Sequence, residues 1–112
     1  MSSSDAVRTE ETLTGPNNYE IWKVWISAKL WAEKAFGIVS GTDIKPVIST
    51  LVTASDIRVW QERDEKAHGI IQLCISNALL MKTCKETSSK GLFDALMTLH
   101  ETQNISSAFY LF

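Results

Sequence analysis

Three of the four tryptophans of this chain lie in the single stretch from Asn18 to Phe36. A step of about 100° per residue places its apolar side chains on one arc, made of Ile21, Trp25, Ala28, Ala32 and Phe36. This arc is widened on one flank by Trp22 and Ile26, and on the other by Val24, Trp31 and Ala35. Only a narrow polar strip remains, consisting of Glu20, Lys23, Ser27 and Lys34. The stretch therefore predicts a central helix that is covered on more than one side, as in a small bundle. Because aromatic side chains contribute much buried area, we interpret this stripe as core and not as a ligand site.

The length and charge of the chain restrict the classes of function. With 112 residues it has room for one domain with a modest core. The 11 basic residues are scattered among 13 acidic ones, for a formal net charge of -2. Strong binding to phosphate needs clustered Lys and Arg, so we expect little direct binding of nucleic acid by this segment. The sequence contains no apolar run long enough to span a membrane and no signal-peptide pattern at its start, which favours a cytoplasmic location.

The sequence before the central helix divides into a tail and a turn. Residues 1–12 are rich in Ser, Thr and charge, and we expect a disordered tail there, with the domain covering residues 13–112. The cluster at residues 14–18 favours a turn. Asn17 or Asn18 is expected to cap the helix, and Leu13 to fold back onto its apolar face.

A connector and a second helix follow the central one. Gly37 is expected to end the first helix, and Gly41 and Pro46 to prevent its continuation. The connector to about Thr53 is so apolar that we expect it to pack across the bundle, with either a short extended segment or a helical turn. Thr53 and Asp56 then resemble a capping box for a helix beginning near Ser55. The inward face of that helix is predicted to consist of Ile57, Trp60, Asp64, Ala67, Ile71 and Cys74, with Ile70 and Ile75 beside it.

Asp64 is the one carboxylate on this apolar face. It needs hydrogen-bond partners there, and we expect the indole of Trp22 or amides of the turn before it. A catalytic role is disfavoured because no second carboxylate, nucleophile or paired His accompanies Asp64 in the pattern.

Two shorter segments complete the predicted bundle of about four to five helices. One is capped by Ser76 or Asn77 and runs to Cys84, and the other begins at Ser88 or Ser89 and ends near His100. The polar residues 102–104 are expected to break the last helix. The spacing of Cys74 and Cys84 does not match a metal site, so we interpret both as buried or half-buried thiols. His68 is placed at a helix border in water, and we predict no cofactor, metal or small-molecule substrate.

An ordered set of residues resembles copia-type retrotransposon Gag polypeptides from about Leu13 to Phe112. The first block is Leu13, Gly15 and the string Asn18-Tyr19-x-x-Trp22-Lys23, followed by Ile26, Leu30, Val39, Gly41-Thr42 and Pro46. The second block is Trp60-x-x-x-Asp64-x-x-Ala67-x-x-Ile70, followed by Ile75-Ser76, Leu80, Phe93-Asp94-Ala95-Leu96 and Tyr110-Leu111. Phe93 stands where the family more often has tryptophan, and Gly91 lies unusually in the first turn of a helix.

The resemblance implies an all-α, capsid-like module that assembles with other Gag copies into particles around the element's RNA and has no enzymatic activity. The family motif residues expected to form the structural core are Tyr19, Trp22, Ile26, Leu30, Trp60, Asp64, Ala67, Ile70, Phe93 and Leu96. The zinc knuckle, protease, integrase and reverse transcriptase of the family are missing from the sequence, so we expect the N-terminal part of a Gag.

The terminal run offers a possible association surface. Its apolar residues are Phe109, Tyr110, Leu111 and Phe112. Exposed together, they would approach the patch size at which soluble monomers begin to associate. A rival hypothesis is a domesticated adaptor whose bundle binds a host peptide in an apolar groove. An enzyme is the third class, and no residue pattern singles it out.

Overall fold

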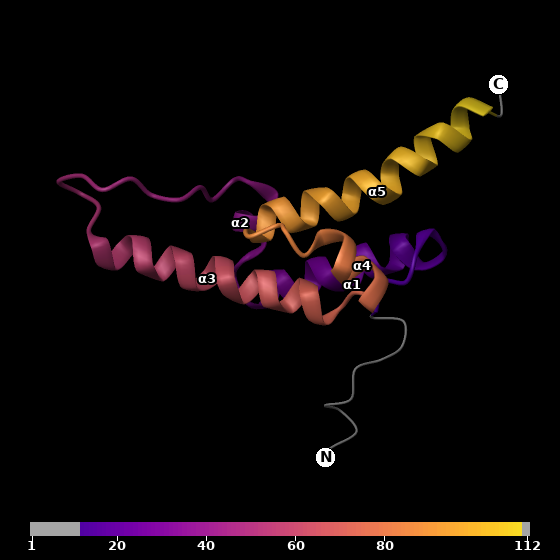
Figure 1. Ribbon diagram of the computed structural model, residues 1–112. Helices are drawn as coiled ribbons and strands as arrows, with labels where there is room; N and C mark the ends of the chain where they lie inside the picture. The colour runs from indigo at the N-terminus through magenta and orange to yellow at the C-terminus, as the bar shows by residue number, and fades with distance from the viewer. Residues whose placement is uncertain (1–11, 111–112) are drawn as a thin grey trace, which may run out of the picture.

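The computed structural model describes residues 12–110, with side chains from Thr12 to Glu101. Within this part the chain forms five α-helices and one 3-10 turn, which confirms the predicted small all-α fold (Figure 1). The elements are η3 (Pro16–Asn18), α1 (Tyr19–Ala32), α2 (Phe36–Ser40), α3 (Ala54–Leu73), α4 (Asn77–Thr83) and α5 (Ser89–Tyr110). The predicted tail lies outside the described residues, apart from Thr12.

The long helix predicted from Asn18 to Phe36 is wrong at its C-terminal end. Helix α1 stops at Ala32, and Lys34 adopts a left-handed conformation with φ of 59°. The Lys34 amide donates to the Trp31 carbonyl, and the Ala35 amide donates to the Leu30 carbonyl, which is the Schellman ending of a helix. Glycine usually occupies this left-handed position, so the sequence pointed instead to Gly37, which lies inside α2.

Helix α2 ends at the glycine that follows it. Gly41 has φ of 94°, and its amide donates to the Gly37 carbonyl. This conformation strains a residue that carries a Cβ, whereas glycine adopts it without cost. The chain thus turns first at Lys34 and again at Gly41, before the connector begins.

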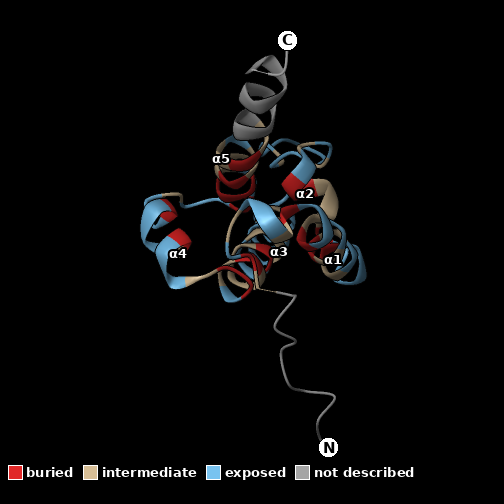
Figure 2. Cartoon of the chain, turned by 90° about the vertical axis from the view of Figure 1, so that its right-hand side faces the viewer, coloured by how far each residue is buried: buried red, intermediate tan, exposed pale blue. Residues whose placement is uncertain are grey.

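The face of α1 that is buried differs from the predicted arc. Its buried side chains are Tyr19, Trp22, Ile26 and Leu30. Ala28 and Ala32 are exposed, and Ile21 is 48% exposed. Figure 2 shows why, since the buried sides of α1, α3 and α5 turn toward one another and exposed residues lie on their outer sides. The expectation that α1 is covered on more than one side is therefore wrong within the described part of the chain.

The segment before α1 is held by hydrogen bonds and not by a helix cap. The Asn18 side chain makes no capping bond, contrary to prediction. Its amide nitrogen donates to the Thr12 carbonyl at 2.8 Å, and its oxygen accepts from the Thr14 amide at 3.2 Å. The Leu13 amide in turn donates to the Cys74 carbonyl, and the Ser76 amide donates to the Leu13 carbonyl. Leu13 is fully buried in the core, as the sequence predicted.

The connector between α2 and α3 does not pack across the bundle. Its apolar side chains point away from the core, with exposed fractions of 75% at Ile44, 80% at Val47 and 90% at Leu51. Figure 1 shows this segment as a long loop that runs out to the start of α3. Local bonds hold its end, where the Ser49 hydroxyl accepts from the amides of Leu51 and Val52. The predicted connector also included Ile38 and Val39, which are buried in α2. Its apolar content thus indicated burial at its start but not from Ile44 onward.

The remaining helices begin where the sequence predicted. Thr53 and Asp56 form the capping box of α3, and the Ser76 hydroxyl accepts from the Leu79 amide at the start of α4. Ala67 and Ile71 on α3 and the C-cap residue Cys74 are buried, while Trp60 and Asp64 are partly buried. The predicted break at residues 102–104 is wrong, because α5 continues to Tyr110. Thr, Gln and Asn lower helix propensity only slightly, and neither Gly nor Pro is present there to stop an established helix.

Replacing Trp22 is expected to destabilise the fold strongly. Trp22 is fully buried, and its indole Nε1 donates to the Cys74 carbonyl at 2.8 Å. Trp22→Ala should cost roughly 3–5 kcal/mol, a large share of the about 5–15 kcal/mol available to a domain. Trp60→Ala is the comparison. Trp60 is only partly buried, so its loss should cost clearly less. Urea unfolding of both variants measures the difference, and equal costs, or a Trp22→Ala variant as stable as the parent, would contradict this assignment.

Candidate interaction surface

Most of the family motif residues lie in one continuous core. Those that are buried are Tyr19, Trp22, Ile26, Leu30, Ala67, Phe93 and Leu96. The others, Trp60, Asp64 and Ile70, are partly buried. The Trp22 ring lies between two aromatic neighbours, with ring centroids 6.3 Å from Tyr19 and 6.2 Å from Phe93. This packing joins α1 to α5.

Trp60 and Arg63 connect α3 to the ends of α1 and α2. The Trp60 indole donates to the Asp43 carbonyl at 3.0 Å. Arg63 donates through Nη2 to the Lys34 carbonyl at 2.6 Å and to the Asp43 carboxylate at 2.8 Å. The Lys34 carbonyl belongs to the Schellman turn, so this guanidinium reinforces the chain reversal after α1.

Asp64 holds the start of α5. Its Oδ1 accepts from the Ser89 hydroxyl at 2.6 Å and from the Ser89 amide at 3.1 Å. The partners expected for this carboxylate, Trp22 and the turn before it, are therefore wrong. A carboxylate beside the free amides of a first helical turn also interacts favourably with the helix dipole. Asp64 thus serves as a joint between α3 and α5.

A polar cluster links α1 to α5 at the edge of the core. The Tyr19 hydroxyl and the Lys23 ammonium both donate to Glu101 Oε2, at 2.5 Å and 2.9 Å. The Tyr19 ring also stacks on the buried His100 ring, with centroids 4.8 Å apart and planes 6° apart. The hydrogen bond from Tyr19 and then that from Lys23 lower the pKa of Glu101. Burial, followed by the bond to Glu101, raises the pKa of Tyr19 far above its ordinary range.

The cysteines and histidines lie apart and do not form a site. Cys74 is buried, but Cys84 is exposed, so the prediction of two buried or half-buried thiols is wrong for Cys84. His68 is partly buried, and its Nε2 lies 2.8 Å from the Glu86 carbonyl. Among the described residues, no group of three or more His, Cys, Asp or Glu side chains is arranged to hold a metal ion. None of the described helices is both long and apolar enough to cross a bilayer.

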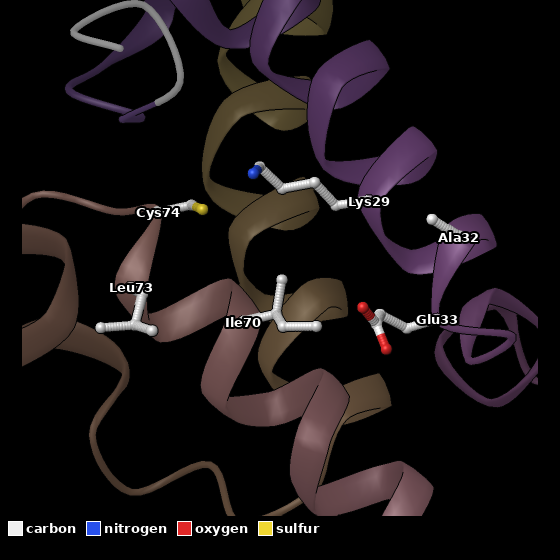
Figure 3. A pocket seen from close by; sticks show the side chains of 6 residues that line it. All are labelled: Lys29, Ala32, Glu33, Ile70, Leu73 and Cys74. Atoms are coloured by element: carbon white, nitrogen blue, oxygen red, sulfur yellow. The ribbon is translucent and has the colours of Figure 1, made fainter. Parts of the chain in front are cut away.

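A shallow groove runs between α1 and α3. Figure 3 shows its lining, with Lys29, Ala32 and Glu33 on α1 or at its end and Ile70, Leu73 and Cys74 along the end of α3. Lys66 forms a 2.7 Å ion pair with Glu33. Leu73 is 79% exposed beside the groove. This groove could not be located from the sequence, because its two sides come from helices far apart in the chain.

Apolar side chains are exposed on the outer faces of several elements. They are Ile21, Val24 and Trp31 on α1, Ile44, Val47, Ile48 and Leu51 in the connector, Val59 and Leu73 on α3, and Met81 on α4. The predicted association surface at Phe109, Tyr110, Leu111 and Phe112 lies outside the described side chains. The exposed apolar area that the structure does describe is therefore concentrated on α1 and the connector.

Comparisons with protein families, with characterised proteins and with solved structures found no match to this chain.

Acid is expected to weaken the polar cluster of Tyr19, Lys23 and Glu101, which joins α1 to α5, in a defined pH range. A carboxyl group whose pKa is lowered by folding stabilises the fold above its unfolded pKa, and this contribution is lost as the pH falls through the folded value. The ordinary pKa of Glu is about 4.3, so the loss should occur below about pH 4 to 5. Tyr19→Phe removes the largest cause of the lowered pKa of Glu101 and should cost about 1 kcal/mol at pH 7.

The joint can be tested by following the Glu101 carboxyl carbon by NMR between about pH 2 and pH 7, a range that brackets the ordinary Glu pKa. The Tyr19→Phe variant should titrate at higher pH than the parent. Glu20→Gln is the matched control, since Glu20 is exposed and does not bond to Glu101. An unchanged Glu101 titration in Tyr19→Phe would show that the hydrogen bond is absent in solution.

Proposed function

We propose that this chain is the capsid-like, N-terminal part of a copia-type retrotransposon Gag, a structural protein that associates with further copies around the element's RNA. The proposal rests first on the ordered set of motif residues that resembles this family. No catalytic role is assigned to any residue. The partner is another Gag copy, in the cytoplasm, and direct RNA binding by this segment is weak.

The observation that carries the proposal is the structural role of the motif residues. Trp22 bonds to the Cys74 carbonyl, Trp60 to the Asp43 carbonyl, and Asp64 to Ser89, so each of them joins two elements of the fold. Motif residues that connect elements of the fold favour a module with a structural function. The motif residues of an enzyme would instead place their polar groups around one cleft.

The exposed surface is consistent with a protein that binds other proteins. The connector presents Val47 and Leu51 to solvent, and α1 presents Val24 and Trp31. Exposed apolar patches of this kind commonly mark sites of protein association.

A domesticated adaptor is the second candidate function, and the groove between α1 and α3 favours it. Ile70 and Cys74 provide an apolar lining, while Lys29 and Glu33 provide charged groups beside it. An apolar groove flanked by charges suits an amphipathic helix or short peptide of a host protein. In this case the chain would bind one partner stoichiometrically and would not build larger assemblies.

The two functions differ in the size of the assembly and in its RNA content. We expect the chain, epitope-tagged at its own locus, to sediment in large particles that protect its own transcript from nuclease. Tagged protein added after lysis is the control for adventitious binding. A chain found only in small complexes without protected RNA would contradict the Gag proposal, and a complex with one partner in equal amounts would support the adaptor.

A further inference from the structure

The outer face of α1 has the residue spacing of a coiled-coil seam. Ile21, Val24, Ala28 and Trp31 are separated by three, four and three residues, and all four are exposed. This is the a and d spacing of a heptad repeat, which is narrower than the apolar stripe of an ordinary surface helix. The opposite face of α1 carries the buried residues Tyr19, Trp22, Ile26 and Leu30. Helix α1 therefore has two apolar faces, of which the fold uses one.

A hollow on this seam has the form of a coiled-coil hole. Its lining includes Val24, Ser27, Ala28 and Trp31, which stand at positions i, i+3, i+4 and i+7 of a single helix. Four side chains in this arrangement are what surrounds an inserted side chain in knobs-into-holes packing. Ala28, one of the lining residues, has a small side chain.

The wall of the hole formed by Trp31 is held in position. Its ring stacks on Phe36 with centroids 5.0 Å apart and planes 16° apart, although Trp31 is 66% exposed. A large aromatic side chain that is already ordered loses little conformational entropy on binding. The Trp31 side of the hole is therefore already ordered before a partner binds.

We propose that a second copy of this chain docks on the seam, with the two α1 helices antiparallel about a two-fold axis. In this arrangement Val24 of each copy enters the hole of the other, and Ile21 lies against the partner's Trp31. The pairing deepens the proposed function, since it names the surface through which two Gag copies meet.

The charges at the two ends of the seam favour the antiparallel direction. Glu20 lies at the start of α1 and Lys34 just after its end, and both are exposed. An antiparallel pair brings Glu20 of one copy beside Lys34 of the other, whereas a parallel pair would place like charges together. The same direction also opposes the two helix dipoles. Only four turns of helix take part, so the dimer should be weak and concentration-dependent.

Val24→Asp tests the seam directly. It places a carboxylate against Ala28 and Trp31 of the partner's hole, whose lining also includes Glu20 and Lys23. It should weaken dimerisation at least about tenfold, because the charge loses its water on docking. Val59→Asp is the matched control, as Val59 is an exposed valine on α3, away from the seam. Sedimentation velocity over about a hundredfold range of concentration gives the dimer constant, and circular dichroism shows that both variants fold.

Crosslinking tests the direction of the helices. Cys84 is exposed and is first replaced by Ser, which leaves the buried Cys74. In the antiparallel pair, which is centred midway between Ile21 and Trp31, Ser27 of one copy lies near Ser27 of the other, whereas the two Glu20 residues lie at opposite ends. A short bismaleimide should therefore crosslink Ser27→Cys dimers and not Glu20→Cys dimers.

The outcomes separate this inference from the proposed function. A monomer at all concentrations, or a dimer weakened equally by Val24→Asp and Val59→Asp, would overturn the seam even if particles form in cells. Equal crosslinking at both cysteine positions would overturn the antiparallel direction. A dimer that Val24→Asp abolishes supports the seam even if no particle forms, in which case the Gag proposal alone would fail.

Discussion

The fold depends on a single carbonyl oxygen, that of Cys74, which accepts two hydrogen bonds inside the core. One comes from the Leu13 amide and the other from the Trp22 indole, both at 2.8 Å. The carbonyl belongs to the C-cap residue of α3, where no further helical amide is available to bind it. The end of α3, the first turn of α1 and the N-terminal segment therefore meet at one point. A buried polar atom left without partners is costly, so these three segments are stable only together.

As a result, the helices around this junction are each buried on one face only. Helices α1, α3 and α5 turn their buried faces toward one another and leave their outer faces in solvent (Figure 2). Asp64, Arg63 and Glu101 then fix the helix ends at the edge of the core. What remains exposed includes the α1 seam, the connector and the groove beside Leu73. A protein whose polar groups join its helices and which exposes apolar residues on α1 and the connector is suited to assembly, which is why the structural function and the α1 pairing are proposed together.

The sequence predicted the features that depend on local interactions. The capping box of Thr53 and Asp56 involves residues three apart, so it can be recognised without tertiary information. The end of α1 could not be predicted in this way, because Lys34 occupies the left-handed position that glycine usually takes. The predicted apolar arc also missed the buried face of α1, on which the motif residues Tyr19, Trp22, Ile26 and Leu30 lie. A helix that is apolar almost all round carries no pattern to decide which face the core will cover.

The candidate site could be predicted only in part for the same reason. The sequence identified Asp64 as needing a partner, but that partner, Ser89, is supplied by a helix that begins 25 residues later. Glu101 and the groove between α1 and α3 had no sequence pattern to mark them. The exposed connector shows the converse error. Its apolar composition predicted packing, whereas Ile44, Val47 and Leu51 are exposed among the described residues.

Hydrogen exchange of the tryptophan indoles tests the central claim about the Cys74 junction most directly. The Trp22 N–H is buried and bonded to the Cys74 carbonyl, so it should exchange only when the whole domain unfolds, with the protection free energy equal to that of global unfolding. The indole of the exposed Trp31 should exchange rapidly, which provides an internal reference in the same spectrum. Protection of Trp22 no greater than that of Trp31 would show that the junction opens locally, and would contradict the account.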